Sequence, residues 1–309
     1  TNEEYIRFVH ELQVLGKSPR CELIVPLPFE TEETYFESVR FLLDAGVEVG
    51  TFTLMMLCGS YLGSKEAQEL YSMVTKYRVL PRDFGEYKGE KVIEVEPVCV
   101  QTSTMPYNSY LRCRRFSFVV ALFGSKFFDI IRRHVHELGI SYFDYVRKAL
   151  DKIEKDESTL SKLYGDFCRE TESELYDSPQ HMGEYFSIEA HYTQLSTGEV
   201  GDNLLRKYTA KAFAMDTNDL YDFAYAVIQD LMSEDSTQYA DALEAARSWA
   251  THVHTVNSVF KSNLPDLIGE KQLSLEYDVY KWYHNPLENE PLWAYNESVS
   301  YQINYDTTY

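Results

Sequence analysis

The segment spanning residues 20–63 constrains the fold most strongly, because an amphipathic helical pattern lies between two apolar runs. The first run, residues 21–28, is short, rich in branched side chains and closed by proline, which predicts a β-strand. A helix should follow, with Thr31 as its N-cap and its apolar side chains on one face. The second run, residues 47–57, predicts another strand. The segment therefore indicates two parallel strands joined by a right-handed crossover.

Four stretches of the N-terminal portion carry a resemblance to a known family. Residues 24–34, IVPLPFETEET, are similar to the fifth barrel strand of radical S-adenosylmethionine (radical SAM) enzymes and the loop that follows it. Residues 50–62, GTFTLMMLCGSYL, resemble their sixth strand and its exit loop. The resemblance continues through residues 76–85 and reaches residues 102–110, TSTMPYNSY. This last pattern is similar to the subset whose members often carry a cobalamin-binding domain upstream.

The resemblance implies a radical enzyme that depends on cofactors. Members of the family cleave S-adenosylmethionine reductively with an iron–sulfur cluster, forming a 5′-deoxyadenosyl radical, and those that use cobalamin can methylate carbon. By resemblance, Val25 and the loop containing Glu30 would lie beside the adenosyl group, with the backbone of Thr53, Leu54 and Met55 on its other side. The parent is expected to be a methyltransferase or an oxidoreductase. The pattern identifies no catalytic residue and no metal ligand in this chain.

Two departures from the family pattern restrict what this chain can supply. Pro26 and Phe29 stand where the family's strand-five loop usually has glycines, so close backbone approach to a ligand is disfavoured there. The C-x3-C-x2-C triplet that holds the cluster is absent from the 309 residues. We therefore expect the chain to be the C-terminal part of a radical SAM enzyme, inactive alone, with the cluster ligands outside it.

The patterns together predict an α/β fold in two parts. Residues 1–124 are expected to form the second half of a partial TIM-like barrel, with strands five and six and their flanking helices. Residues 125–309 are expected to form a mostly helical domain ending in a β-hairpin, made by residues 273–280 and 299–305. Other expectations are a helix over residues 64–77, irregular chain over 78–97 in which the alternating residues 92–96 could form a short exposed strand, a loop over 183–201 and a helix over 239–260.

Charge and hydropathy narrow the classes of partner. The net charge of −20 disfavours an extended nucleic-acid partner, which needs clustered lysine and arginine. No apolar window is long enough for a transmembrane helix, and the N-terminus does not resemble a signal peptide. The five cysteines have irregular spacing, which favours the reducing cytoplasm. We expect a small-molecule or peptide substrate, no membrane partner, and a missing N-terminal half or another chain covering the open edge of the half-barrel.

Other polar residues are interpreted as structural. His134 and His136 are two apart on a predicted helix, so their side chains diverge and cannot chelate one metal ion together. Glu170 and Glu174 share a helical face, but the histidines of a carboxylate-bridged metal site are absent, so we expect a solvated face. Glu30 is instead a candidate functional residue, because it follows the carboxyl end of a predicted parallel strand, where barrel enzymes place their functional residues. It could also simply open the next helix.

Two other functional classes stay open on sequence grounds. The first is a non-catalytic helical interaction protein that carries a barrel remnant. The second is a segment of an ordinary TIM-barrel enzyme without a cluster. That class predicts carboxylates or lysines at strand ends, where only Glu30 qualifies. A C-x3-C-x2-C triplet encoded upstream would decide for the radical enzyme.

Overall fold

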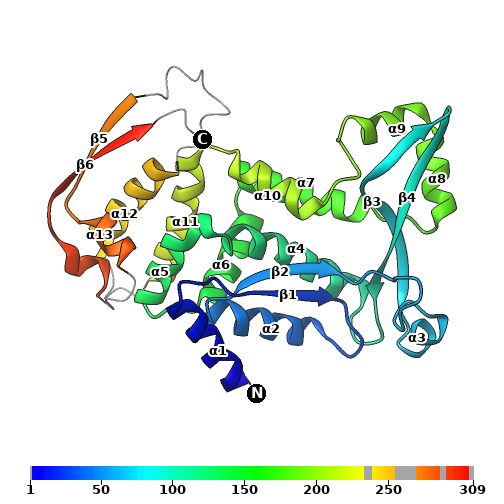
Figure 1. Cartoon of the computed structure of the whole chain (residues 1–309), viewed down its shortest axis with the longest axis horizontal. Helices are drawn as coiled ribbons and strands as arrows, with labels where there is room; N and C mark the ends of the chain where they lie inside the picture. The colour runs from blue at the N-terminus through cyan, green and yellow to red at the C-terminus, as the bar shows by residue number, and fades with distance from the viewer. Residues whose placement is uncertain (1, 233–238, 255–268, 286–289, 306–309) are drawn as a thin grey trace. The chain divides into compact units, whose positions relative to one another are not determined.

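The computed structural model describes residues 2–232, 239–254, 269–285 and 290–305. Its fold is mixed α/β, with helices predominating and three two-stranded sheets among the described residues (Figure 1). Contacts divide the chain into two compact units. Unit 1 is Thr1–Ala121 with Ser161–Thr209, and unit 2 is Leu122–Leu160 with Ala210–Tyr309. Within the described ranges, no helix has the length and apolar character that crossing a membrane requires.

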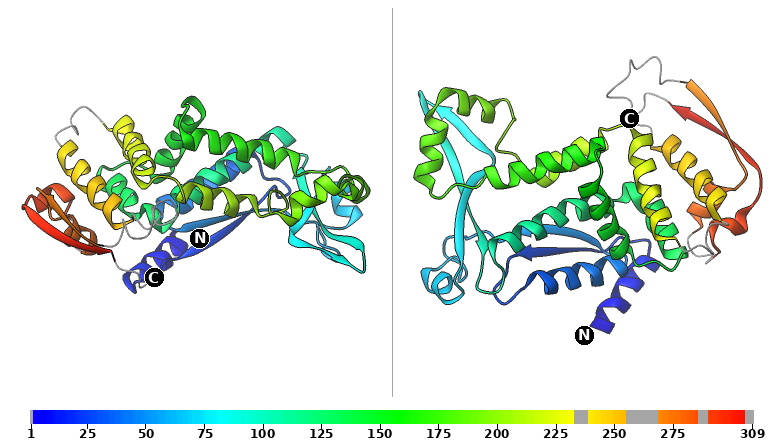
Figure 2. Two further views of the ribbon diagram at one scale, coloured as in Figure 1. Left: turned by 90° about the horizontal axis from the view of Figure 1, so that it is seen from above. Right: turned by 180° about the vertical axis from the view of Figure 1, so that it is seen from behind.

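The predicted strand–helix–strand unit is confirmed in unit 1. Strands β1 (Arg20–Val25) and β2 (Glu48–Thr53) pair in parallel. Helix α2 (Glu32–Asp44) connects them and runs alongside both strands (Figures 1 and 2). Strand β2 ends at Thr53 rather than at residue 57, because the chain beyond it bridges to the next sheet. The described residues form no closed barrel, since their parallel sheet consists of these two strands.

Helix α2 is fixed by its cap and by its buried face. The Thr34 N–H donates to the Thr31 hydroxyl and the Thr31 N–H donates to the Thr34 hydroxyl, which forms a reciprocal capping box. Tyr35 is fully buried, and its hydroxyl lies 3.0 Å from the Ser117 hydroxyl of α4 (Tyr107–Phe123). These contacts attach α2 to α4, and burying one large apolar side chain stabilises a fold by about 1.5–3 kcal/mol.

A long antiparallel hairpin replaces the irregular chain that was expected over residues 78–97. It consists of β3 (Val74–Tyr87) and β4 (Glu90–Gln101). The strand expected over residues 92–96 is confirmed as part of β4. The irregular chain expected around it was wrong, because proline and glycine mark irregularities inside a continuous hairpin. Pro81 falls where the pairing register shifts, and Gly89 occupies the turn with a positive φ of 83°.

Two further expectations for unit 1 were wrong. The helix expected over residues 64–77 is limited to α3 (Lys65–Leu70), because the chain soon enters β3. The loop expected over residues 183–201 contains two short helices, α8 (Pro179–Ser187) and α9 (Glu189–Ser196), which pack on the hairpin. Their shared core is Val79, Met182, Phe186, Tyr192 and Leu195. The other helices are α1 (Asn2–Val14), α7 (Thr159–Ser173) and α10 (Leu204–Phe213), and the boundaries between the units fall within α4, α7 and α10.

Unit 2 is largely helical and carries the predicted terminal hairpin (Figure 2). Strands β5 (Gly269–Leu275) and β6 (Val299–Tyr305) pair antiparallel, which confirms the pairing, but the described chain between them contains two short helices rather than a simple loop. The first strand lies earlier than residues 273–280, because Asp278 caps a helix by accepting from the Lys281 N–H. The part of the predicted helix 239–260 beyond residue 254 lies outside the described residues. The helices are η1 (Lys126–Phe128), α5 (Asp129–Glu137), α6 (Tyr142–Lys155), α11 (Thr217–Leu231), α12 (Ala240–Val253), α13 (Val279–His284) and η5 (Leu292–Tyr295).

A carboxylate ties the last helices of unit 2 to α5. Glu137 Oε1 accepts hydrogen bonds from the Trp282 indole N–H at 2.7 Å and from Arg133 Nε at 3.2 Å. The Leu292 N–H donates to the second oxygen at 3.3 Å. Burial raises the pKa of Glu137, although these donors act in the opposite direction. One side chain therefore joins α5, α13 and η5.

Replacing Glu137 with alanine should destabilise unit 2. Glu137→Ala leaves the Trp282 indole N–H and the Arg133 Nε–H without their acceptor, which should lower the free energy of unfolding by about 2–4 kcal/mol. The exposed Glu157 provides the control. Glu157→Ala should change the free energy of unfolding by less than about 0.5 kcal/mol. Denaturant unfolding followed by tryptophan fluorescence reports on unit 2, which contains all three tryptophans. Equal changes in the two variants would refute the anchoring role.

Candidate functional site at the carboxyl edge of β1 and β2

Three of the five residues expected beside a nucleoside adjoin one another at the carboxyl edge of β1 and β2. Val25 and Thr53 are the last cross-strand pair of the sheet. The Leu54 N–H donates to the Val25 carbonyl at 3.0 Å. All three residues are buried. The edge is therefore closely packed, and its accessible groups belong to the neighbouring loops.

Tyr110, which sequence reasoning did not single out, supports this edge. Its hydroxyl lies 3.2 Å from Thr53 Oγ1, and its side chain is almost fully buried. Burial raises the pKa of Tyr110, so the phenol stays protonated at neutral pH and can donate to Thr53. The only signal in the sequence is the position of Tyr110 at the end of the 102–110 pattern, in the first turn of α4.

Glu30 closes a tight turn after β1. Its N–H donates to the Leu27 carbonyl, and its Oε2 accepts from the Leu27 N–H, both at 3.2 Å. Thr104 Oγ1 donates to the Glu30 carbonyl at 2.7 Å. Burial raises the pKa of Glu30, and the bond from Leu27 opposes this effect. Because Glu30 precedes the N-cap Thr31, it belongs to the loop at the strand end rather than to α2.

Met55 is the most accessible of the five residues. It is 41% exposed and bridges to Val98 of β4. The hydrogen bonds that flank this bridge use the Leu54 carbonyl and the Met56 N–H. In such an antiparallel pair the central residue's own N–H and C=O point away from the partner strand. The peptide groups of Met55 are therefore directed away from the hairpin.

One face of the parallel sheet is open and apolar near this edge. Ile24 and Phe52 are cross-strand partners on that face and are 42% and 43% exposed. Val25 and Thr53, on the other face, are buried. Phe29, in the left-handed region at φ 67°, is also exposed. Apolar surface beside backbone polar groups and a half-buried carboxylate can receive a flat heterocycle with polar substituents.

Glu170 and Glu174 do not form the solvated face expected from the sequence. The Arg78 guanidinium lies 3.2 Å from a Glu174 oxygen and 2.5 Å from a Glu96 oxygen. Lys207 Nζ lies 2.6 Å from Glu170 Oε1. The expectation was wrong because the cations that pair with Glu170 and Glu174 come from α10 and β3, and helical periodicity says nothing about distant elements.

The described residues offer no cluster of metal ligands. Among them, no group of three or more histidine, cysteine or acidic side chains could hold a metal ion together. None of the five cysteines forms a disulfide in the described structure. His134 is buried against Trp282, with ring centroids 4.6 Å apart. Burial, with a smaller contribution from Arg133, lowers the pKa of His134 to about 3, so its imidazole is neutral.

Comparisons of the sequence with models of protein families and with curated proteins found no match.

Removing the charge of Glu30 should change how stability depends on pH. Because burial raises the pKa of Glu30 above its ordinary 4.5, the folded state holds this proton more tightly than the unfolded state. The ionised Glu30 therefore destabilises the folded state. This cost is absent at low pH, where Glu30 is protonated in both states, and it develops as the pH rises above the ordinary pKa of 4.5. Glu30→Gln should therefore gain stability relative to the wild type between about pH 4 and pH 7.

Melting temperatures measured across this pH range test the expectation. The exposed Glu33, on the first turn of α2, provides the matched control. The difference in melting temperature between Glu33→Gln and the wild type should not increase as the pH rises. A constant difference between Glu30→Gln and the wild type at all pH values would contradict the raised pKa.

Proposed function

We propose that the chain is part of a radical SAM enzyme and forms one wall of its S-adenosylmethionine site. The observation that carries the proposal is the parallel β1–α2–β2 unit, whose carboxyl edge presents Glu30 and Met55 beside the packed pair Val25 and Thr53. Parallel strands in α/β folds place their functional groups at this edge. The resemblance of the same two strands to the fifth and sixth strands of the family supports the same location.

The residues at this edge fit an adenosyl group. Ile24 and Phe52 would supply apolar contact to the base, and the peptide groups of Met55 would bind its polar atoms. The Glu30 carboxylate would accept from hydroxyls or face a positive charge. Leu54 would shape the wall between them. When bound, S-adenosylmethionine supplies the radical chemistry, while these residues bind and orient it.

We place the iron–sulfur ligands outside this chain. Such a cluster needs thiolates that meet at one point. In the described residues the cysteines are dispersed, with Cys99 and Cys113 buried and Cys58 exposed. The parent would act on a small molecule or a peptide. It would be an oxidoreductase or, with cobalamin as a second cofactor, a methyltransferase.

Strand β1 has an edge at which the barrel would continue. Within the described residues β1 pairs with β2 alone. The Val25 carbonyl faces β2, so by alternation the peptide groups of Glu22 and Ile24 face the other way. We propose that these groups pair with a further parallel strand of the half-barrel. That strand would come from the N-terminal half of the parent or from another chain.

The gene product that contains this chain, purified without oxygen, should contain about four irons per chain and cleave S-adenosylmethionine on reduction. Ile24→Arg should weaken S-adenosylmethionine binding at least about tenfold, because a charged side chain would cover the apolar face. Ile188, which is 53% exposed and precedes α9, provides the matched control, and Ile188→Arg should leave binding unchanged. Equilibrium dialysis and quantification of iron and 5′-deoxyadenosine measure these outcomes.

Two results would count against the proposal in different ways. Absence of both iron and cleavage would overturn the family assignment and favour the non-catalytic helical interaction protein. Cleavage with equal binding by both isoleucine variants would keep the family and exclude the open face of β1 and β2 as the nucleoside wall.

The chain alone should associate through the free edge of β1. Glu22→Pro removes an N–H on the outer edge and leaves the hydrogen bonds to β2 in place, so it should shift the chain toward monomer. Glu22→Ala removes the same side chain but keeps the N–H, and should associate like the wild type. Sedimentation velocity measures the change. A wild-type chain that is strictly monomeric at all concentrations would contradict the open edge.

A further inference from the structure

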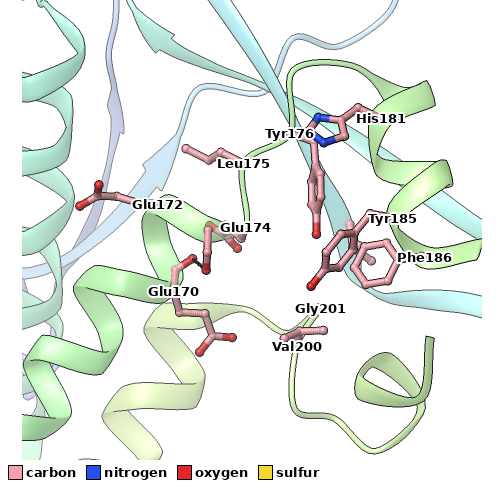
Figure 3. Close-up of a pocket in the computed structure, with 12 residues that line it drawn as sticks. Glu170, Glu172, Glu174, Leu175, Tyr176, His181, Tyr185, Phe186, Val200 and Gly201 are labelled. Atoms are coloured by element: carbon pink, nitrogen blue, oxygen red, sulfur yellow. Dashed lines mark hydrogen bonds between the residues drawn. The ribbon is translucent and has the colours of Figure 1, made fainter. Parts of the chain in front are cut away.

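A hollow of about 350 Å³ lies in unit 1, and it shares no lining residue with the carboxyl edge of β1 and β2. It is bounded by the end of α7, by α8, by β3 and by the turn at Gly201. One wall consists of Tyr176, Tyr185 and Phe186, whose ring centroids lie 5.0–5.8 Å apart. Figure 3 shows the rings on one side of the hollow and Glu170 and Glu174 on the other.

The walls of the hollow are held in place by the fold itself. Tyr176 exchanges two backbone hydrogen bonds with Tyr77 of β3, at 2.7 and 2.9 Å. On the opposite side the Arg82 N–H donates to the Gly201 carbonyl at 3.1 Å. Gly201 has a φ of 77°, and a Cβ there would lie 2.5 Å from Leu195. A ligand would therefore meet a preformed wall and lose little affinity to ordering it.

The carboxylates that line the hollow are not equally neutralised. Glu170 has Lys207 as a partner of its own, at 2.6 Å. Glu174 shares the Arg78 guanidinium with Glu96 and has a further, more distant positive charge in Arg114. Burial still raises the pKa of Glu174 despite both arginines. A further positive charge in the hollow would thus stabilise its ionised form.

We infer that this hollow binds a small organic ammonium ion, with its charged group between the aromatic wall and Glu174. Aromatic rings attract ammonium groups, and a nearby carboxylate adds direct Coulomb attraction. A bare metal ion fits less well, because the described acidic side chains do not converge into a metal-binding group. The volume is at the lower end of the range for small-molecule sites. The inference does not rest on the proposed function.

Choline and its uncharged carbon isostere, in which carbon replaces the quaternary nitrogen, form a matched pair of probes. Ligand-observed NMR titration of the whole chain should show saturable choline binding. The isostere should bind at least about tenfold more weakly, since it keeps the shape but loses the charge. This comparison uses the wild-type protein and needs no variant to fold.

Two pairs of variants locate the binding. Glu174→Gln should weaken choline binding about tenfold without changing binding of the isostere, whereas Glu184→Gln, at an exposed residue of α8, should change neither. Tyr185→Leu should weaken choline more than the isostere, because it removes a ring but keeps an apolar side chain. Tyr87→Leu, at the exposed tip of the hairpin, is its control.

Equal affinity for choline and its isostere, or no binding of either, would overturn the inference. An equal loss of choline affinity in Glu174→Gln and Glu184→Gln would also overturn the inference. Such a result would mean that the net negative charge of the protein surface, and not Glu174 in the hollow, attracts choline. Loss of iron or of S-adenosylmethionine cleavage in the gene product would not bear on this site. The two proposals therefore fail separately.

Discussion

Parallel strands cannot pair through a tight turn, and this constraint organises unit 1. The pairing of β1 with β2 requires a crossover, and α2 provides it while covering one face of the sheet. The contact between Tyr35 and Ser117 then attaches α4, and α4 in turn brings Tyr110 to Thr53. The carboxyl edge is therefore supported by elements far apart in the sequence. Among the residues that the structure describes, none covers the opposite face in this way, which leaves Ile24 and Phe52 accessible.

Buried ion pairs form a second layer of organisation in this acidic protein. Arg78 reaches from β3 to Glu96 on its partner strand and to Glu174 beyond α7. Because Arg78 and Glu96 are both largely buried, removing either partner would leave an uncompensated charge inside the protein. The same guanidinium helps to fix the position of the carboxylate that faces the hollow. Fold stability and the charge of that surface are thus linked through one side chain.

Local patterns predicted the elements that depend on local chemistry. The strand–helix–strand unit follows from two short apolar runs and the cap at Thr31, and the terminal hairpin follows from alternation. Predictions failed where distant partners decide the structure. Pro81 suggested irregular chain, but it lies in a long hairpin. Glu170 suggested a solvent-exposed helix face, but it forms an ion pair with Lys207 of α10. Of the candidate site, the strand ends could be located, whereas Tyr110 required knowledge of how α4 packs.

The order of the two units along the chain has a consequence for synthesis on the ribosome. Unit 1 contains residues on both sides of Leu122–Leu160, so its second segment emerges only after the first segment of unit 2. The hairpin β3–β4 lacks the helices that cover it until residues near Ser196 have been made. During that interval the apolar side chains of the hairpin are exposed, and exposed strands favour association with other chains. The interval between translation of β4 and translation of α9 is therefore the one in which the hairpin of a nascent chain lies open to pairing with other chains.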